Sequence, residues 1–148
     1  MSDVKRADPE YPICDLLAER WSPYGLDPRP VSASDLRSLF EAARWAPSSY
    51  NEQPWRYLVA TREDRTAFDD LLSCLVEPNQ QWARNASVLV LTVASLSFAR
   101  GGKPNAVARH DIGLASANLT VEATARGLVV HQMAGILPDR ARELYGIP

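Results

Sequence analysis

One segment of the chain, residues 106–126, is apolar or small on nearly every face when it is drawn as a helix. A helix without a polar face must be covered by protein, either in a core or in an interface between chains. Gly127 is the residue at which this helix is expected to end. The helix is therefore predicted to be buried in or against an interface between two copies of the chain. Its apolar and small residues are Ile112, Gly113, Leu114, Ala115, Ala117, Leu119, Val121 and Ala123.

Four further helices and three strands are predicted from hydrophobic periodicity and end signals. The second helix begins at Ser32, three residues before Asp35, and Pro47 ends it. Residues 88–94 are mostly apolar, which is typical of a central strand covered on both faces. Because helices lie between the strands, we predict an α/β (α+β) fold, a three-layer sandwich with a central sheet flanked by helices. The other helices are expected at 13–21, 64–76 and 138–146, and the other strands at 55–61 and 128–133.

The composition fits a single domain covering residues 1–148, in which residues 1–12 are expected to be loose. A net charge of −2 gives no basic field that would recruit nucleic acid or an anionic membrane surface. No run reaches the roughly 18 apolar residues that a membrane span needs, and the charged N-terminus is unlike a signal peptide. The two cysteines, Cys14 and Cys74, are expected to be reduced, which favours a cytoplasmic location.

The usual catalytic and metal-binding patterns are missing from the sequence. His110 and His131 lie on different predicted elements with no cysteine near either, so no metal site is predicted. There is no G-x-S-x-G motif, and Ser48-Ser49 has no recognisable partner for a triad. The phosphate loop G-x-x-x-x-G-K-[ST] and the dinucleotide motif G-x-G-x-x-G are absent too. We therefore name no catalytic residue and no metal ligand.

Residues 42–55, AARWAPSSYNEQPW, are the most informative segment of the chain. Pro47 breaks a helix, two serine hydroxyls follow, and Asn51 and Gln53 add amide groups before a strand begins. Such a loop at the end of a sheet can grip a flat ring that has many polar atoms on its edge. The alternative is an ordinary turn that satisfies its own backbone groups.

The ten residues from Ala46 to Trp55, A-P-S-S-x-N-x-Q-P-W, resemble the signature loop of the FMN-dependent nitroreductase family. Four other segments resemble further parts of that family in the same order along the chain. They are the Arg-x-Ser segment at 20–22, a flavin-contacting stretch at 79–82, the central dimer helix at 110–119 and the turn beside the flavin ring at 132–135. The resemblance extends from about Leu16 to Pro148.

The resemblance implies an oxidoreductase that holds FMN at a homodimer interface, with two flavin sites shared between the chains. Hydride would pass from NADH or NADPH through the flavin to an electron-poor small molecule, a nitroaromatic or a quinone. No side chain need act as a catalytic base, because the flavin carries the redox chemistry. The implied FMN-binding residues are Arg20, Trp21, Ser22, Pro47, Ser48, Ser49, Asn51, Gln53, Asn79, Trp82, Gln132, Met133, Ala134 and Gly135.

Each part of the site has an implied role in the family pattern. Arg20 and Ser22 would bind the FMN phosphate, and residues 47–51 would approach the flavin of the other subunit. Gln53 would either reach the flavin or support its loop, and Trp82 would either face the flavin or pack beneath the loop. Asn79 would bond near the ring or the ribityl chain, and residues 132–135 would border the ring.

Two departures from the family pattern leave an alternative open. Tyr24 stands where many relatives have a second basic residue, and the C-terminal strand or strands of the family domain are expected to be missing after Pro148. The alternative reading is a non-catalytic flavin-binding or structural relative with a shortened C-terminus.

Overall fold

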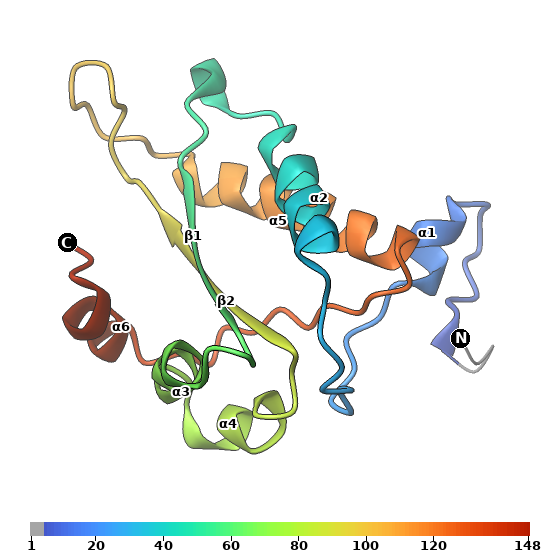
Figure 1. The fold of residues 1–148 in the computed structure, drawn as a ribbon. Helices are drawn as coiled ribbons and strands as arrows, with labels where there is room; N and C mark the ends of the chain where they lie inside the picture. The colour runs from blue at the N-terminus through green and yellow to red at the C-terminus, as the bar shows by residue number, and fades with distance from the viewer. Residues whose placement is uncertain (1–4) are drawn as a thin grey trace. The chain divides into compact units, whose positions relative to one another are not determined.

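The structure, a computed structural model, describes residues 5–148 (Figure 1). These residues divide into two compact units, one made of residues up to 23, 32–56 and 92–131, and the other of residues 24–31, 57–91 and 132–148. Among residues 5–148, no helix has both the length and the apolar character that crossing a bilayer requires. The elements are α1 (Asp15–Glu19), α2 (Ala33–Arg44), a 3-10 turn (Ser49–Asn51), β1 (Trp55–Thr61), α3 (Arg65–Ser73), α4 (Glu77–Ala83), β2 (Val88–Ala94), α5 (Ala108–Ala125) and α6 (Pro138–Tyr145).

The first unit is built on α5, which α2 and α1 contact (Figure 1). Small side chains let the helices approach closely, and Ala43 on α2 and Ala115 on α5 are fully buried. Asn118 of α5 adds a polar tie, because its Nδ2 donates to the carbonyl of Ala42 at 3.2 Å. The predicted helix 106–126 is thus confirmed as α5, and one of its faces is covered within the chain.

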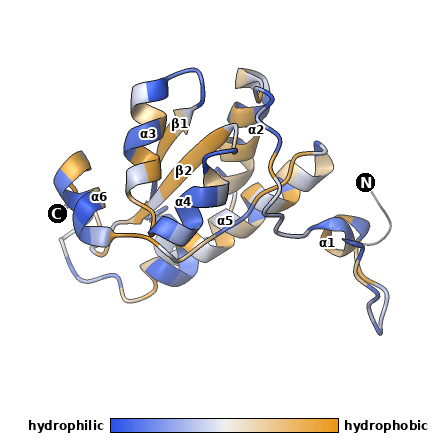
Figure 2. Cartoon of the chain, turned by 90° about the horizontal axis from the view of Figure 1, so that it is seen from below, coloured by the Kyte–Doolittle hydropathy of each residue, from blue (hydrophilic) through white to orange (hydrophobic). Residues whose placement is uncertain are grey.

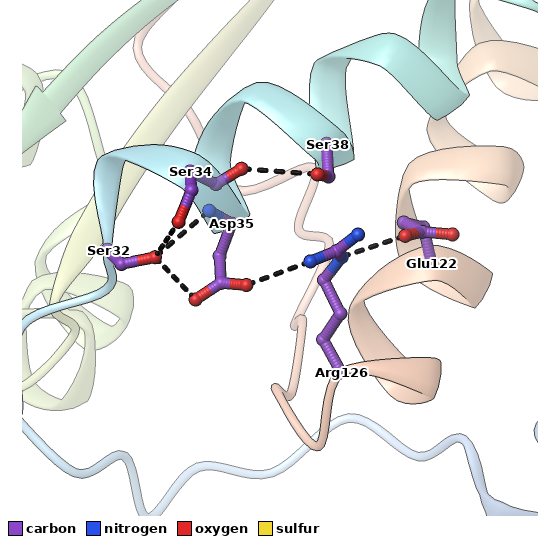
Figure 3. Close-up of polar contacts among 6 residues, drawn as sticks. All are labelled: Ser32, Ser34, Asp35, Ser38, Glu122 and Arg126. Carbon is purple, nitrogen blue, oxygen red and sulfur yellow. Dashed lines mark hydrogen bonds and ion pairs between the residues drawn. The ribbon is translucent and has the colours of Figure 1, made fainter.

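A polar network joins the start of α2 to the end of α5 (Figure 3). Ser32 is the N-cap of α2, as its spacing to Asp35 predicted, because its Oγ accepts from the Asp35 backbone N–H at 3.0 Å. The Asp35 carboxylate in turn accepts from Arg126 at 3.0 Å. Arg126 also pairs with Glu122 one turn earlier on α5. The network therefore fastens the two helices at one end of their contact.

The second unit has its own hydrophobic core. Phe68 of α3 is 1% exposed, and the residues around it come from α3, α4 and the parts of β1 and β2 that lie in this unit. Figure 2 shows the apolar colouring along β2, as its sequence predicted. The expectation of a central strand covered on both faces was wrong, because within residues 5–148 β2 pairs with β1 alone and Val90 is 40% exposed. Tyr145 of α6 packs against the same cluster. The buried members are Ala60, Phe68, Leu71, Leu75, Ala83, Ala86 and Leu89.

The two strands pair side by side, at the residues that the sequence predicted. Arg62 N donates to Ser87 O at one end of the ladder, and Ser95 N donates to Pro54 O at the other. This pairing is antiparallel, because the residue numbers rise along one strand as they fall along the other.

Two predictions about secondary structure were wrong. The strand expected at 128–133 is not formed, because a strand requires a partner and the sheet in residues 5–148 consists of β1 and β2. The short helix α4 was not predicted. Its seven residues include Pro78, and proline usually breaks a helix. In the first turn it is tolerated, because backbone N–H groups there form no hydrogen bond within the helix.

Replacing Asp35 by Asn is expected to lower the melting temperature at neutral pH, and the difference from wild type should shrink as the solution is acidified. The hydrogen bond from Ser32, and then the bond from Arg126, hold the Asp35 pKa below its ordinary value. A carboxylate with a lowered folded-state pKa stabilises above its unfolded pKa, and the contribution is lost as pH falls below about 4. Thermal melts between pH 7 and pH 3 measure this.

The matched control is Asp69→Asn, which removes an exposed ion pair with Arg65 one turn away on α3. Such pairs contribute little to stability. A gap between Asp35→Asn and wild type that stays constant down to pH 3 would contradict the assigned network.

Candidate functional site

The loop from Trp45 to Pro54 connects α2 to β1 (Figure 1). Its backbone is strained at three residues. Tyr50, Asn51 and Gln53 have φ values of 52°, 56° and 50°, although none of them is glycine. Residues other than glycine avoid this left-handed region, and each such conformation costs about 1–3 kcal/mol. Other contacts of the loop must therefore hold it in this conformation.

Three hydrogen bonds supply this support within the first unit. Ser48 Oγ accepts from the Gln53 backbone N–H at 2.9 Å, and Gln53 Nε2 donates to Asn51 Oδ1 at 3.0 Å. The Ser49 backbone N–H donates to the Asp111 carboxylate at 3.1 Å. Gln53 thus supports the loop in this structure, which is one of the two roles expected for it. The Asn51 side chain lies exposed at the surface of the same loop.

Asp111 is a site residue that the sequence did not single out for this role. Its side chain lies in the first turn of α5 and is only 3% exposed. The sequence separation of 62 residues from Ser49 leaves no local pattern that would reveal the contact. A helix N-terminus favours a carboxylate, so α5 stabilises the same group that anchors the loop.

The segment after α1 presents a cation to the solvent. Arg20 follows the last residue of α1 in an extended conformation and is exposed. Within residues 5–148, its guanidinium makes no hydrogen bond or ion pair. Trp21 beside it lies under the ammonium group of Lys5, 5.3 Å from the ring centre, and Ser22 is exposed. An exposed guanidinium without an internal partner suits an anion from outside, such as a phosphate.

The second unit brings Asn79 together with the predicted turn at 132–135. Asn79 Nδ2 donates to the Gly135 carbonyl at 3.1 Å, and the Val76 backbone N–H donates to the same oxygen at 3.0 Å. Leu137 N donates to Cys74 O at 2.7 Å. The chain around Gly135 is therefore fastened along residues 74–79.

Gly135 has no room for a side chain. A Cβ at this position would stand 2.4 Å from Asn79 Nδ2 and 3.0 Å from Val76 Cγ2. Its backbone φ is not in the left-handed region, so the close approach of Asn79 is the reason for glycine here.

The remaining candidates of the second unit lie around this turn and over its core. Trp82 is half-buried against the hydrophobic core, and the edge of Tyr24 meets its ring with the centres 5.2 Å apart. This geometry supports the packing role that was one of two expected for Trp82. Met133 also packs against the core, while Gln132 and Ala134 are exposed.

The structure thus gathers the candidates into two groups. The first unit holds Arg20, Trp21, Ser22 and the loop residues Pro47, Ser48, Ser49, Asn51 and Gln53. The second unit holds Asn79, Trp82, Gln132, Met133, Ala134 and Gly135. In the described part of the chain, His, Cys, Asp and Glu side chains form no group of three that would hold a metal ion.

The chain is similar to proteins of a known family. The model of the Nitroreductase family matches residues 17–148. A crystal structure described as an oxidoreductase containing FMN is 36% identical in sequence and superposes with a TM-score of 0.90. The match spans all of this chain and 76% of the FMN-containing chain. A nitroreductase-family protein from Clostridium difficile is 23% identical and superposes with a TM-score of 0.74. This match spans 90% of the present chain and 74% of the Clostridium chain. These structures confirm the predicted nitroreductase-like fold.

Two curated relatives match over shorter stretches. The nitrobenzene nitroreductase of Ectopseudomonas oleovorans is 43% identical over 53 residues, which is 36% of this chain and 23% of the relative. The major NAD(P)H-flavin oxidoreductase of Aliivibrio fischeri is 32% identical over 92 residues, which is 61% of this chain and 42% of the relative. The matched part is thus less than half the length of either relative.

Replacing Gly135 by Ala is expected to lower the free energy of unfolding by about 1–3 kcal/mol, the usual cost of forcing extra volume into a packed site. The new methyl group would overlap the amide of Asn79. Urea denaturation measures the loss, and adding Asn79→Ala should recover part of it.

The matched control is Gly25→Ala in the same unit, where no atom outside the adjoining residues lies within 4 Å of the new Cβ. This variant should be close to wild type. A Gly135→Ala protein as stable as wild type would show that Asn79 does not press on this turn.

Proposed function

Because this chain belongs to the nitroreductase family, we propose that it is an FMN-dependent oxidoreductase. It takes hydride from NADH or NADPH and reduces an electron-poor small molecule, a nitroaromatic or a quinone. The observation that supports this best is the strained loop at 46–55, which holds hydroxyl and amide groups in a fixed conformation against the buried carboxylate of Asp111. The FMN-containing relative that superposes over the whole chain adds support.

The candidate residues fit FMN. Among residues 5–148, the exposed Arg20 guanidinium has no hydrogen-bond or ion-pair partner, which suits a phosphate site. Gly135 lets the Asn79 side chain approach and fasten the turn at 132–135, which is the segment proposed to border the ring. When bound, FMN would supply the hydride chemistry, and the protein would supply binding and orientation.

The chain's own groups then have these roles. Arg20 and Ser22 bind the phosphate through charged and neutral hydrogen bonds. Ser49 and Asn51 present hydroxyl and amide groups to the polar edge of the ring. Asn79 fixes the turn at Gly135, whose neighbouring backbone borders the ring. No side chain is assigned as a general base, and we name none as catalytic.

We propose that the active form is a homodimer in which the 47–51 loop reaches the flavin of the other chain. Two exposed small residues on α5, Gly113 and Ala117, lie one turn apart on the side of the helix that this chain leaves open. A second copy would cover that side with close helix packing, as the sequence of α5 anticipates.

A second candidate function is flavin binding without turnover. Tyr24, at the position where the resemblance implies a second basic residue, meets the Trp82 ring with its edge and adds no charge. The phosphate would then depend mainly on Arg20.

The purified protein is expected to be yellow, with flavin absorbance that acid releases as FMN, and to oxidise NADH or NADPH when a quinone or nitroaromatic is added. Absorbance spectra and steady-state oxidation rates measure both properties. Yellow protein without oxidation would favour the second candidate. Protein that stays colourless after incubation with FMN would reject both.

The shared site predicts complementation between two inactive variants. The Arg20→Ala homodimer should lose most of its FMN, because a charged hydrogen bond to phosphate contributes about 1.5–3 kcal/mol. The Asn51→Ala homodimer should also lose FMN, because it lacks the amide proposed for the ring edge and the acceptor that Gln53 bonds within the loop. In a mixed dimer with shared sites, one site carries both changes and the other carries neither. Mixing the two proteins should therefore restore flavin binding that neither shows alone.

Native mass spectrometry first verifies that the subunits exchange, and flavin retention is then measured. If both residues served the same chain's site, each site of the mixed dimer would carry one change and nothing would be regained. Proven exchange without recovery would therefore reject the shared site and leave the flavin assignment standing.

A further inference from the structure

We propose that His131 is a positioning residue for the phosphate end of the flavin site, a role that rests on the proposed function. His131 Nδ1 lies 3.0 Å from the Pro23 carbonyl oxygen, and the two residues are 108 positions apart in the chain. A carbonyl oxygen only accepts, so Nδ1 carries the proton and donates it to this bond. The contact joins the chain after α5 to the segment that presents Arg20.

The Arg20 segment needs such a support. Residues 20–22 have no helix or strand of their own, so no regular hydrogen-bond pattern fixes them. On the upstream side, α1 contacts α5, Ala18 is buried, and the Ala7 backbone N–H donates to the Ala18 carbonyl at 2.8 Å. The segment is therefore anchored before Arg20 by the helix.

The downstream anchor is Pro23. Its ring is fully buried, and proline has no backbone N–H, so the carbonyl is its one backbone group that can form a hydrogen bond. His131 takes that group. With α1 on one side and His131 on the other, the backbone that carries Arg20 and Ser22 is held at both ends.

The two anchors of the Arg20 segment should affect the binding of FMN, which has a phosphate, but not the binding of riboflavin, which has none. A segment that is already ordered loses less conformational freedom when its side chains bind a phosphate, so affinity rises. Riboflavin has the ring and the ribityl chain of FMN but lacks the phosphate. Loss of the His131 contact should therefore weaken FMN binding and leave riboflavin binding unchanged.

Three substitutions distinguish the effect of losing the Nδ1–H donor of His131 from the effect of losing the volume of its ring. His131→Asn places an amide N–H near the position of Nδ1, His131→Gln carries its amide farther out, near the position of Nε2, and His131→Leu removes both donors. The matched control is His110→Leu, because His110 is the chain's other histidine and is exposed on α5.

The experiment is a titration of each apoprotein with FMN and with riboflavin, followed by quenching of flavin fluorescence. His131→Leu and His131→Gln should bind FMN roughly fivefold more weakly, the effect of one neutral hydrogen bond, with no change for riboflavin. His131→Asn and His110→Leu should behave as wild type. In an Arg20→Ala, Ser22→Ala background, His131→Leu should add no further loss, because it acts through these two residues.

Each other outcome is decisive. An equal loss for FMN and riboflavin, or a His131→Gln protein as good as His131→Asn, would overturn the role of His131. Suppose that wild type binds FMN more tightly than riboflavin, that Arg20→Ala abolishes this difference and that the His131 variants leave it unchanged. In that case the proposed function stands and the role of His131 is rejected. If wild type binds neither flavin, the proposed function falls and takes the inference with it. Circular dichroism melts verify folding, and if His131→Leu does not fold, the comparison of Asn with Gln decides.

Discussion

The close contact between α2 and α5 is the interaction on which the first unit depends. Alanines buried in this contact let the two helices approach closely, and the polar ties are placed along α5. Asp111 in its first turn holds the strained loop, Asn118 binds the end of α2, and Arg126 fastens the start of α2. A change that separated the helices would release all three ties together. The geometry of the proposed flavin loop is therefore a property of α5 as much as of the loop itself.

The second unit reaches a comparable rigidity with backbone groups. The Gly135 carbonyl accepts two hydrogen bonds, from Val76 N and Asn79 Nδ2, so this turn is fixed without any side chain of its own. A residue with a Cβ would displace the Asn79 side chain and break one of these two bonds. The two units thus fasten their candidate residues differently. In the first unit a buried carboxylate holds the loop, and in the second unit a backbone N–H and a side-chain amide hold the turn.

Features set by local sequence were predictable, and features set by distant contacts were not. The Ser32 cap, α5 and both strands follow from neighbouring residues, and they were confirmed at or near the expected positions. The strand expected at 128–133 has suitable apolar residues, but pairing is decided by a neighbour that no local pattern reveals. The same reasoning applies to the contacts of Ser49 with Asp111 and of Pro23 with His131, which join residues far apart in the chain.

The strained loop connects these points to function. A turn that needed only to reverse the chain could use glycine at its positive φ positions without cost. This loop instead has Tyr50, Asn51 and Gln53 at its positive φ positions. The hydrogen bonds to Ser48 and Asp111 offset part of the conformational free energy that these residues cost. Such strain is typical of a site in which side chains must be held ready before a ligand arrives. The buried carboxylate of Asp111 accepts from the backbone of this loop. It thereby helps to keep the loop in the fixed shape that a flat ligand such as the proposed flavin would need.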